Sequence, residues 1–228
     1  MKKIKTIIIL LLWLSVSLPV FSKTLTFQDY FDLGKKYYWD GEYNLSIQNF
    51  EKAKKLKPNS YEVLNELGIA YCDANNCELG LKHLQKALSL HPNDARIYHN
   101  LGIAYDRLRN YDLALKNCQK AINLSPDFAD AYYTLGVIYK HIHKYDLAIN
   151  QYNKIIGFGI DHPKVYNDLG LIYLEQKLYD KAIKNFEKVI KLDPERPQGY
   201  YNLSLAYKNK GDNNNALKYF LKYKELGY

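Results

Sequence analysis

The sequence predicts an all-α solenoid, a stack of helix–turn–helix units, because one pattern recurs every 34 residues from Phe27 to the end of the chain. The pattern is marked by a Leu-Gly pair, which becomes Leu-Ser in its last copy: Leu33-Gly34, Leu67-Gly68, Leu101-Gly102, Leu135-Gly136, Leu169-Gly170 and Leu203-Ser204. Three residues later stands a tyrosine, from Tyr37 to Tyr207, and nine residues after it a small residue, from Ser46 to Ala216. Period and spacing together indicate repeated helix pairs.

The third unit shows how the pattern predicts its two helices. Tyr98 and Tyr105 lie at helical spacing on a first helix, and Ala114 and Ala121 do so on a second. The small side chains let the two helices approach closely. Pro126 then ends the second helix and begins the turn into the next unit.

The fourth unit departs from this pattern at its end. Gly157 and Gly159 stand in its last stretch, and no proline occurs at the position that Pro126 occupies in the third unit. Glycine costs about 1 kcal/mol against alanine inside a helix. We therefore expect the second helix of this unit to stop near Ile156 and the following junction to be the weakest.

The period resembles the tetratricopeptide repeat, and the resemblance covers residues 27–228 as five full units and a shorter sixth: 27–60, 61–94, 95–128, 129–162, 163–196 and 197–228. It implies a right-handed solenoid whose first helices line a concave groove. It also implies a non-catalytic protein that binds other proteins.

Both ends of the stack are expected to be polar. In the first unit, Asp29 and Lys36 occupy positions that face the preceding unit and are mostly apolar in later units. In the last unit, Lys224 stands where the second to fifth units hold leucine or isoleucine. Polar outer faces keep terminal repeats soluble.

Residues 1–22 are interpreted as a secretory signal peptide, followed by a short N-terminal segment over residues 23–26. Three lysines precede an apolar run over residues 7–21, and Val20 and Ser22 suit cleavage after Ser22. The protein is therefore expected to be exported, to the periplasm or outside the cell. The alternative is an uncleaved anchor over residues 6–22, although spanning a bilayer takes about 20 apolar residues. No cysteine near the cleavage site offers a point of lipid attachment.

The chain is basic, with a formal net charge of +8 that cleavage after Ser22 lowers to +5. Its lysines concentrate on second helices, on the convex side, as in Lys181, Lys184, Lys188 and Lys191. They form either a solvated face or a surface with weak attraction to anionic lipid or wall polymer. Membrane contact is expected only through this face or an uncleaved signal segment, and no nucleic-acid partner is predicted.

The resemblance also indicates which residues line the groove. The candidate partner-binding residues are Phe31, Tyr38, Trp39, Asn65, Ile69, Arg96, His99, Ile103, Arg107, Tyr133, Val137, Lys140, Asn167, Leu171, Tyr201 and Leu205. An aliphatic residue stands at position nine of nearly every unit, which fits either a peptide-binding stripe or packing between neighbouring helices. The family's carboxylate clamp needs asparagine at position nine, so it is absent.

Three aromatic residues near the open N-terminal end, Phe31, Tyr38 and Trp39, favour the binding interpretation. Phe31 and Trp39 lie outside the packing positions of the family. Replacing them is therefore expected to remove contact area and to leave stability unchanged.

The sequence predicts no enzyme, cofactor or metal site. It has no glycine-rich phosphate loop and no nucleophile elbow. His141 and His143 could only join Asp146, without a second ligand cluster.

Two kinds of cysteine are expected. Cys118 is predicted to be a buried, inert thiol. Cys72 and Cys77 flank a turn and are expected to be free thiols, with a disulfide as the alternative in an oxidising compartment.

Three functions fit these features. The first is an exported, non-catalytic scaffold that binds a partner peptide or helix in its concave groove. The second is a membrane-associated assembly factor that resembles the six-repeat pilotins of type IV pili. The third is a glycan or cell-wall binding module that uses Tyr133, Tyr201 and the Asn65/Asn167 pair.

Overall fold

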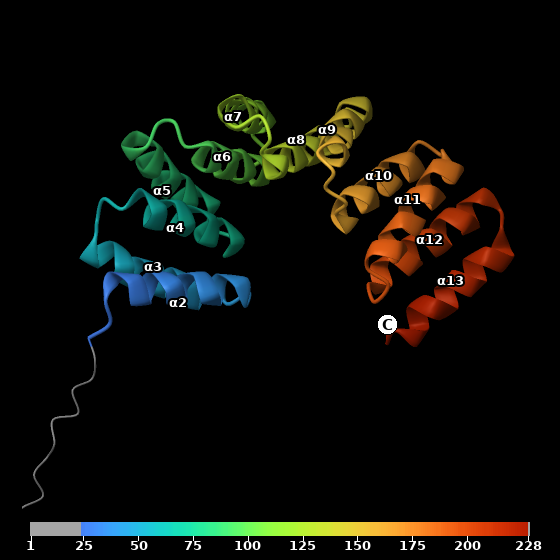
Figure 1. Cartoon of the computed structure of the whole chain (residues 1–228), viewed down its shortest axis with the longest axis horizontal. Coiled ribbons are helices and arrows are strands. Elements are labelled where there is room, and N and C mark those ends of the chain that lie inside the picture. Colours follow the sequence, from blue (N-terminus) through green and yellow to red (C-terminus); the bar gives the residue numbers. More distant parts are fainter. Residues whose placement is uncertain (1–23, 228) are drawn as a thin grey trace, which may run out of the picture.

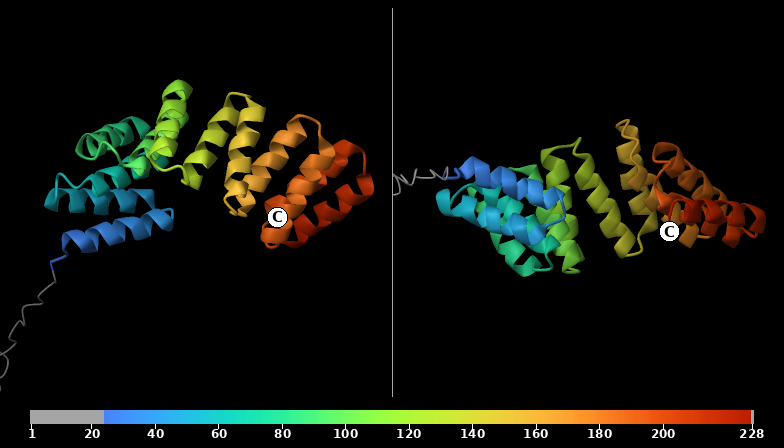
Figure 2. Two further views of the ribbon diagram at one scale, coloured as in Figure 1. Left: turned by 45° about the horizontal axis from the view of Figure 1, so that its top comes forward. Right: turned by 90° about the horizontal axis from the view of Figure 1, so that it is seen from below.

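The computed structural model describes residues 24–227, which form twelve α-helices and no strand within that range. In chain order the helices are α2 (Phe27–Trp39), α3 (Tyr43–Leu56), α4 (Tyr61–Asp73), α5 (Cys77–Leu90), α6 (Ala95–Arg107), α7 (Tyr111–Leu124), α8 (Ala129–His141), α9 (Tyr145–Gly157), α10 (Pro163–Glu175), α11 (Tyr179–Leu192), α12 (Pro197–Lys210) and α13 (Asn213–Glu225). Consecutive helices pair, and the pairs stack into an arch (Figures 1 and 2). The predicted all-α solenoid is confirmed.

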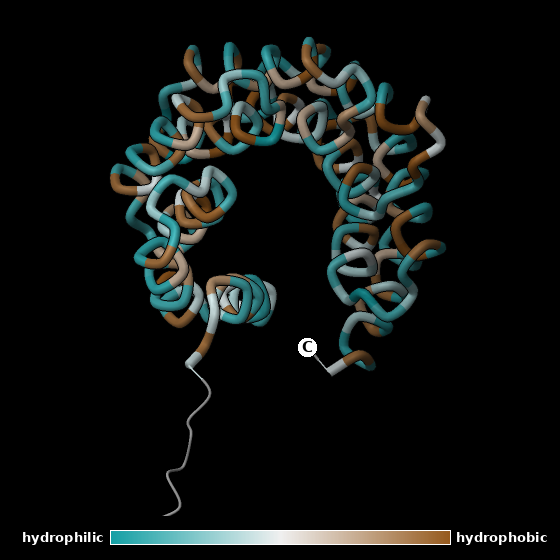
Figure 3. The backbone as a smooth tube through the Cα atoms, turned by 60° about the vertical axis from the view of Figure 1, so that its left-hand side comes forward, coloured by the Kyte–Doolittle hydropathy of each residue, from teal (hydrophilic) through white to brown (hydrophobic). Residues whose placement is uncertain are grey.

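The first helix of each pair lies toward the inside of the arch. In Figure 1, α6 and α8 lie inside while α7 and α9 lie outside. Seen from the side, the backbone forms an open ring (Figure 3). The inner helices therefore lie along the concave side of this ring.

Each helix pair turns at one residue with a positive φ angle, at the same position of every unit. These residues are Gly41, Asn75, Arg109, His143, Lys177 and Gly211. The next backbone N–H donates to the carbonyl of the repeated tyrosine, as Asn76 does to Tyr71 over 2.8 Å. The carbonyl of the repeated tyrosine therefore accepts a hydrogen bond from the turn that ends each first helix.

The glycine of the Leu-Gly pair makes room for a large side chain of the second helix. A Cβ atom added at Gly170 would lie 2.5 Å from the ring of Phe186, which is fully buried. Gly136 is placed in the same way against Tyr152. The two helices of a unit approach closely because this position carries no side chain.

Cys72 and Cys77 form a disulfide, so the expectation of free thiols is wrong. Cys72 lies one residue before the end of α4, and Cys77 is the first residue of α5. The tight turn at Asn75 brings their Cα atoms to 4.0 Å. Cys118 is buried and unpaired, as predicted, and burial raises the pKa of its thiol to about 12.

The fourth unit ends as the sequence predicts, because α9 stops at Gly157. Phe158, Gly159 and Ile160 follow as an exposed connection with a positive φ at Gly159. Of the contacts between consecutive units, the packing of α9 on α10 is the least extensive. The junction between the fourth and fifth units is therefore the loosest in the described stack.

Hydrogen exchange is expected to be faster at this junction than elsewhere. Amides of residues 158–165 should exchange faster than those of residues 124–131, which are equivalent in the preceding unit, because fewer packed side chains oppose local opening. Exchange followed by mass spectrometry on the folded protein measures both segments together. Equal protection of the two segments would contradict a weak junction.

The two ends of the stack differ from each other. At the N-terminal end, Asp29 forms a capping box with Thr26, and Lys36 is exposed. At the C-terminal end the predicted polar cap is wrong, because α13 leaves Leu217 59% and Leu221 52% exposed. No helix within residues 24–227 covers these side chains, and the exposed Lys224 alone does not make the face polar.

The predicted signal peptide over residues 1–22, and the alternative anchor over residues 6–22, lie outside the described residues. Within residues 24–227, no helix combines the length and the apolar character that crossing a membrane requires.

Candidate functional site

The inner face of the arch carries a row of half-buried aliphatic side chains, one from each of five consecutive inner helices. They are Ile69, Ile103, Val137, Leu171 and Leu205. At the N-terminal end of the row, the same position holds the exposed Lys35. Because each aliphatic side chain keeps part of its surface in solvent, the row packs between neighbouring helices and still offers an apolar strip.

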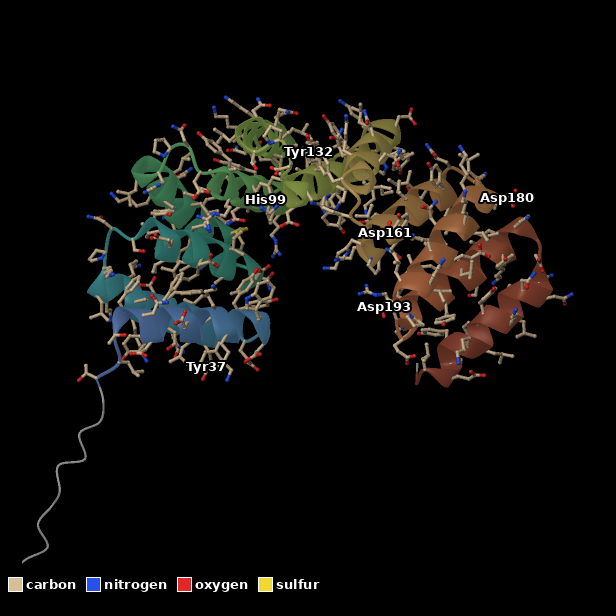
Figure 4. All side chains as sticks on the ribbon, viewed as in Figure 1. Tyr37, His99, Tyr132, Asp161, Asp180 and Asp193 are labelled. Carbon is tan, nitrogen blue, oxygen red and sulfur yellow. A yellow bond between two sulfur atoms is a disulfide. The ribbon has the colours of Figure 1, made fainter. Side chains whose placement is uncertain are left out.

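A first ladder of hydrogen bonds runs beside this row. It joins position five of one unit to position six of the next: Asn100 Nδ2 to Asn65 Oδ1 (2.9 Å), His99 Nε2 with Thr134 Oγ1 (2.9 Å), Tyr133 Oη to Asp168 Oδ2 (2.7 Å) and Asn202 Nδ2 to Asn167 Oδ1 (2.8 Å). His99 is labelled on the inner helix α6 in Figure 4. Four candidate binding residues are thus also links between units.

A second ladder joins position twelve of one unit to position thirteen of the next. Tyr38 donates to Asp73 over 2.5 Å, Arg107 donates to the carbonyl of Cys72 over 2.9 Å, and His141 Nδ1 lies 2.9 Å from Asp106 Oδ1. Arg107 also forms an ion pair with Asp73. Asp73 therefore holds both Tyr38 and Arg107 in place.

Burial shapes the chemistry of these side chains. It lowers the pKa of His99, so its imidazole stays neutral around neutral pH. Burial also raises the pKa of Tyr133, and the neighbouring Asp168 carboxylate adds to the effect. The ladder at these positions is consequently made of neutral donors that bridge units, together with the Lys140–Asp168 ion pair.

Trp39 is a highly exposed candidate residue, with 80% of its surface in solvent. Its ring stands edge-on to that of Tyr38, with centroids 5.8 Å apart. It lies at the end of α2, the first inner helix, beside the open end of the row. An exposed tryptophan at this place is a strong candidate for partner contact.

Phe31 does not behave as expected. Its ring packs against the buried Phe50, with centroids 5.7 Å apart, and stacks on Phe27. Gly34, one turn along α2, has no side chain, so the Phe50 ring reaches beneath the helix to Phe31. The prediction that Phe31 lies outside the packing is wrong.

The remaining candidates have mixed surroundings. Arg96 forms an ion pair with Asp94, the residue that caps α6, over 2.8 Å. Tyr201 is 40% exposed and its ring lies 5.4 Å from that of Tyr223 on α13. Neither side chain is buried, so both can reach a partner on the inner face.

The two histidines that are close in sequence have separate partners. His141 pairs with Asp106 of the preceding unit. His143 Nδ1 lies 2.7 Å from the hydroxyl of Tyr145. Among residues 24–227 there is no group of three or more histidine, cysteine or acidic side chains placed to hold a metal ion.

The residues at position six, including Asn100, Thr134 and Asp168, are not among the candidates predicted from the sequence. No single residue type fills this position, which holds Asp32, Glu66, Asn100, Thr134, Asp168 and Asn202. The signal is a pairing, since a polar residue at position five is followed by a polar residue 35 places later.

Three solved structures resemble the chain in fold. PilF of Pseudomonas aeruginosa has a TM-score of 0.73 at 19% identity, over 88% of this chain and 91% of that one. A chain of the APC/C hetero-tetramer Cut9–Hcn1 has a TM-score of 0.77 at 17% identity, over 89% of this chain and only 40% of that one. A thermophilic TPR protein of Thermus thermophilus has a TM-score of 0.73 at 21% identity, over 79% of this chain and 98% of that one.

Family models agree with the fold. A model described as TPR repeat matches residues 70–108 and 170–211. Models described as tetratricopeptide repeat match residues 95–128, 117–150 and 197–226. A comparison with curated proteins gives no match. The chain is therefore a tetratricopeptide-repeat protein.

Proposed function

We propose that the protein is an exported, non-enzymatic scaffold that binds a partner peptide or helix along the inner face of its arch. Tetratricopeptide repeats generally serve as scaffolds for protein–protein interaction. The observation that carries the proposal is the apolar row on five inner helices, which ends beside the exposed Trp39. Apolar surface that continues over several elements is typical of interaction sites.

The ladders indicate the chemistry of the partner. Many polar groups on the inner face already bond to the next unit, as Asn65 does to Asn100 and Tyr133 to Asp168. What remains for a partner is mainly the aliphatic strip and the aromatic end. The partner is therefore expected to present apolar side chains at regular spacing, as an extended peptide or an amphipathic helix does.

Site-specific photo-crosslinking tests this proposal. A photoreactive amino acid at Leu171 on the inner face should crosslink a partner in the native cell envelope. The same amino acid at Lys120, which is exposed on the outer helix α7, serves as the control. Crosslinks of equal yield and identity from both positions would rule out an inner binding face.

Export is part of the proposal and has its own support. The Cys72–Cys77 disulfide suits an oxidising compartment, because cytosolic thiols are kept reduced. The alternative is that residues 6–22 remain as an anchor.

N-terminal sequencing of the mature protein is expected to begin at Lys23, because cleavage after Ser22 leaves small residues at the required positions. Intact Met1 in a membrane fraction that resists carbonate extraction would instead establish the anchor.

A second candidate function is that of an assembly factor like the pilotins, favoured by the similarity to PilF over nearly its whole length. The crosslinked partner separates the two, since a pilotin-like factor would capture a pilus component. Glycan binding is less favoured, because Tyr133, Asn65 and Asn167 already use polar atoms within the protein. Displacement of the partner by soluble wall polymer would revive it.

A further inference from the structure

A groove opens between the outer helices α9 and α11, where the fourth and fifth units meet. It has a volume of about 560 Å³. Tyr166, Leu169 and Tyr173 of α10, with Ile156 of α9, supply its apolar lining. The loose packing of α9 on α10 leaves this lining reachable from the outer side of the arch.

One wall of the groove is a row of lysines along α11. The row consists of Lys181, Lys184, Lys188 and Lys191. Their spacing of three and four residues places them on one helix face over roughly 15 Å. Four positive charges therefore run alongside an apolar floor.

The position of Lys188 holds lysine in every unit, but only the fifth unit has lysine at all four positions of the row. At the position of Lys181, the first four units hold leucine and the sixth holds asparagine: Leu45, Leu79, Leu113, Leu147 and Asn215. At the position of Lys191, the third and fourth units hold Asn123 and Gly157. The fifth unit therefore carries at least two more lysines along this face than any other unit.

The lysines keep an excess of positive charge after their contacts within the protein. Lys188 forms an ion pair with Asp161 over 2.7 Å. Glu187 also lines the groove and accepts a hydrogen bond from the hydroxyl of Tyr207 over 3.4 Å. Asp180, labelled in Figure 4, pairs with Lys210. The groove therefore holds four lysines against one glutamate of its own lining. Lys184 and Lys191 are exposed at the rim.

Two lysine stems lie over the aromatic floor, which links the charged and apolar parts of the groove. Lys181 Nζ is 5.3 Å from the Tyr173 ring centroid, and Lys188 Nζ is 5.3 Å from that of Tyr166. A ligand that contacts the rings therefore also passes the ammonium groups.

We propose that the α9–α11 groove binds an acidic peptide segment of a partner protein that carries aromatic or aliphatic side chains. Carboxylates spaced along a chain match the line of lysines, and apolar side chains match the floor. A flat bilayer surface reaches the lysine heads but not a floor that lies in a hollow between two helices. The contact is separate from the inner face and does not depend on it.

Fluorescence anisotropy with a short labelled peptide of glutamate, phenylalanine and leucine tests the proposal on the full mature chain at low salt. Lys184→Gln combined with Lys191→Gln should weaken binding about tenfold, since each exposed charge contact is worth up to about 1 kcal/mol. The matched control, Lys116→Gln with Lys120→Gln on α7, removes the same charge from another outer helix. It should leave binding unchanged.

Three outcomes would overturn the proposal. The first is an equal loss in the α7 control, which would mean attraction to net charge alone. The second is unchanged affinity when serine replaces phenylalanine and leucine in the peptide, which would mean that the floor is not used. The third is binding to phosphatidylglycerol vesicles that the α11 variant abolishes, with no binding of the peptide, which would assign the row to a membrane surface.

Discussion

Trp39→Ala is expected to weaken binding of the inner-face partner at least about thirtyfold and to leave the melting temperature unchanged. Truncation of a large aromatic at a binding hot spot costs about 2 kcal/mol or more. The side chain is 80% exposed, so little of the fold depends on it. Titration of the crosslinked partner's binding segment into both proteins, with parallel thermal melts, measures the two effects.

Leu221→Ala is the matched control for this variant. Leu221 is also a large exposed apolar residue, but it lies on α13 at the other end of the arch. Its loss should leave affinity unaltered. If both variants bind as wild type, Trp39 is not a contact, and the aromatic end has no part in recognition.

Phe31→Ala cannot serve the same purpose, although the sequence alone suggested that it could. Because Phe31 packs on Phe50, its truncation should lower stability as other losses of packed aromatic area do. A double variant of Phe31 and Trp39 would therefore mix folding with binding. The two single variants separate them.

Gly170→Ala is expected to destabilise the protein by about 1–3 kcal/mol, the usual cost of overpacking a filled core. Three ring atoms of Phe186 lie within 2.8 Å of the added Cβ position. Phe186 is fully buried, so its ring has no free space to move into. The better helix propensity of alanine, about 1 kcal/mol, offsets only part of this cost. Chemical denaturation measures the difference.

Gly157→Ala is the matched control, because a Cβ at Gly157 meets nothing within 4 Å. It should be neutral or stabilising. A Gly170→Ala protein as stable as the wild type would mean that Phe186 yields easily and that the close approach is not required.

The last unit has a side chain in place of the glycine of the Leu-Gly pair. Ser204 replaces the glycine there, and its hydroxyl donates to the carbonyl of Tyr201 over 2.8 Å. Phe220, which corresponds to Phe186, is 39% exposed. In the last unit a side chain at the glycine position thus goes together with a less buried ring on the second helix.

The periodic features of the fold could be predicted because they depend on spacing within one unit. The end of α9 at Gly157 follows from two glycines, and the close helix pairs follow from the Leu-Gly and alanine positions. Features that depend on the three-dimensional path of the chain could not be predicted. The disulfide depends on how sharply the chain turns at Asn75, and the sequence does not specify that turn.

The sequence predicts which residues form the candidate site better than it predicts what each of them does. The aliphatic row and Trp39 lie where the repeat places them. Asn65, His99 and Tyr133 were expected to face a partner, and each also bonds to the next unit. The offset of 35 residues between bonded partners arises from how neighbouring inner helices are shifted along one another, which a period of 34 does not reveal.

The offset of 35 residues between bonded partners also has a consequence for changes in the number of units. Since each rung of the first ladder joins position five to position six of the next unit, whole units can be lost or duplicated and the polar partners stay in step. Without the third unit, Asn65 would meet Thr134, and with that unit doubled, a copy of His99 would meet Asn100. Either pairing leaves a donor opposite an acceptor. Loss or duplication of a unit would therefore change the length of the inner surface and keep its polar side chains paired.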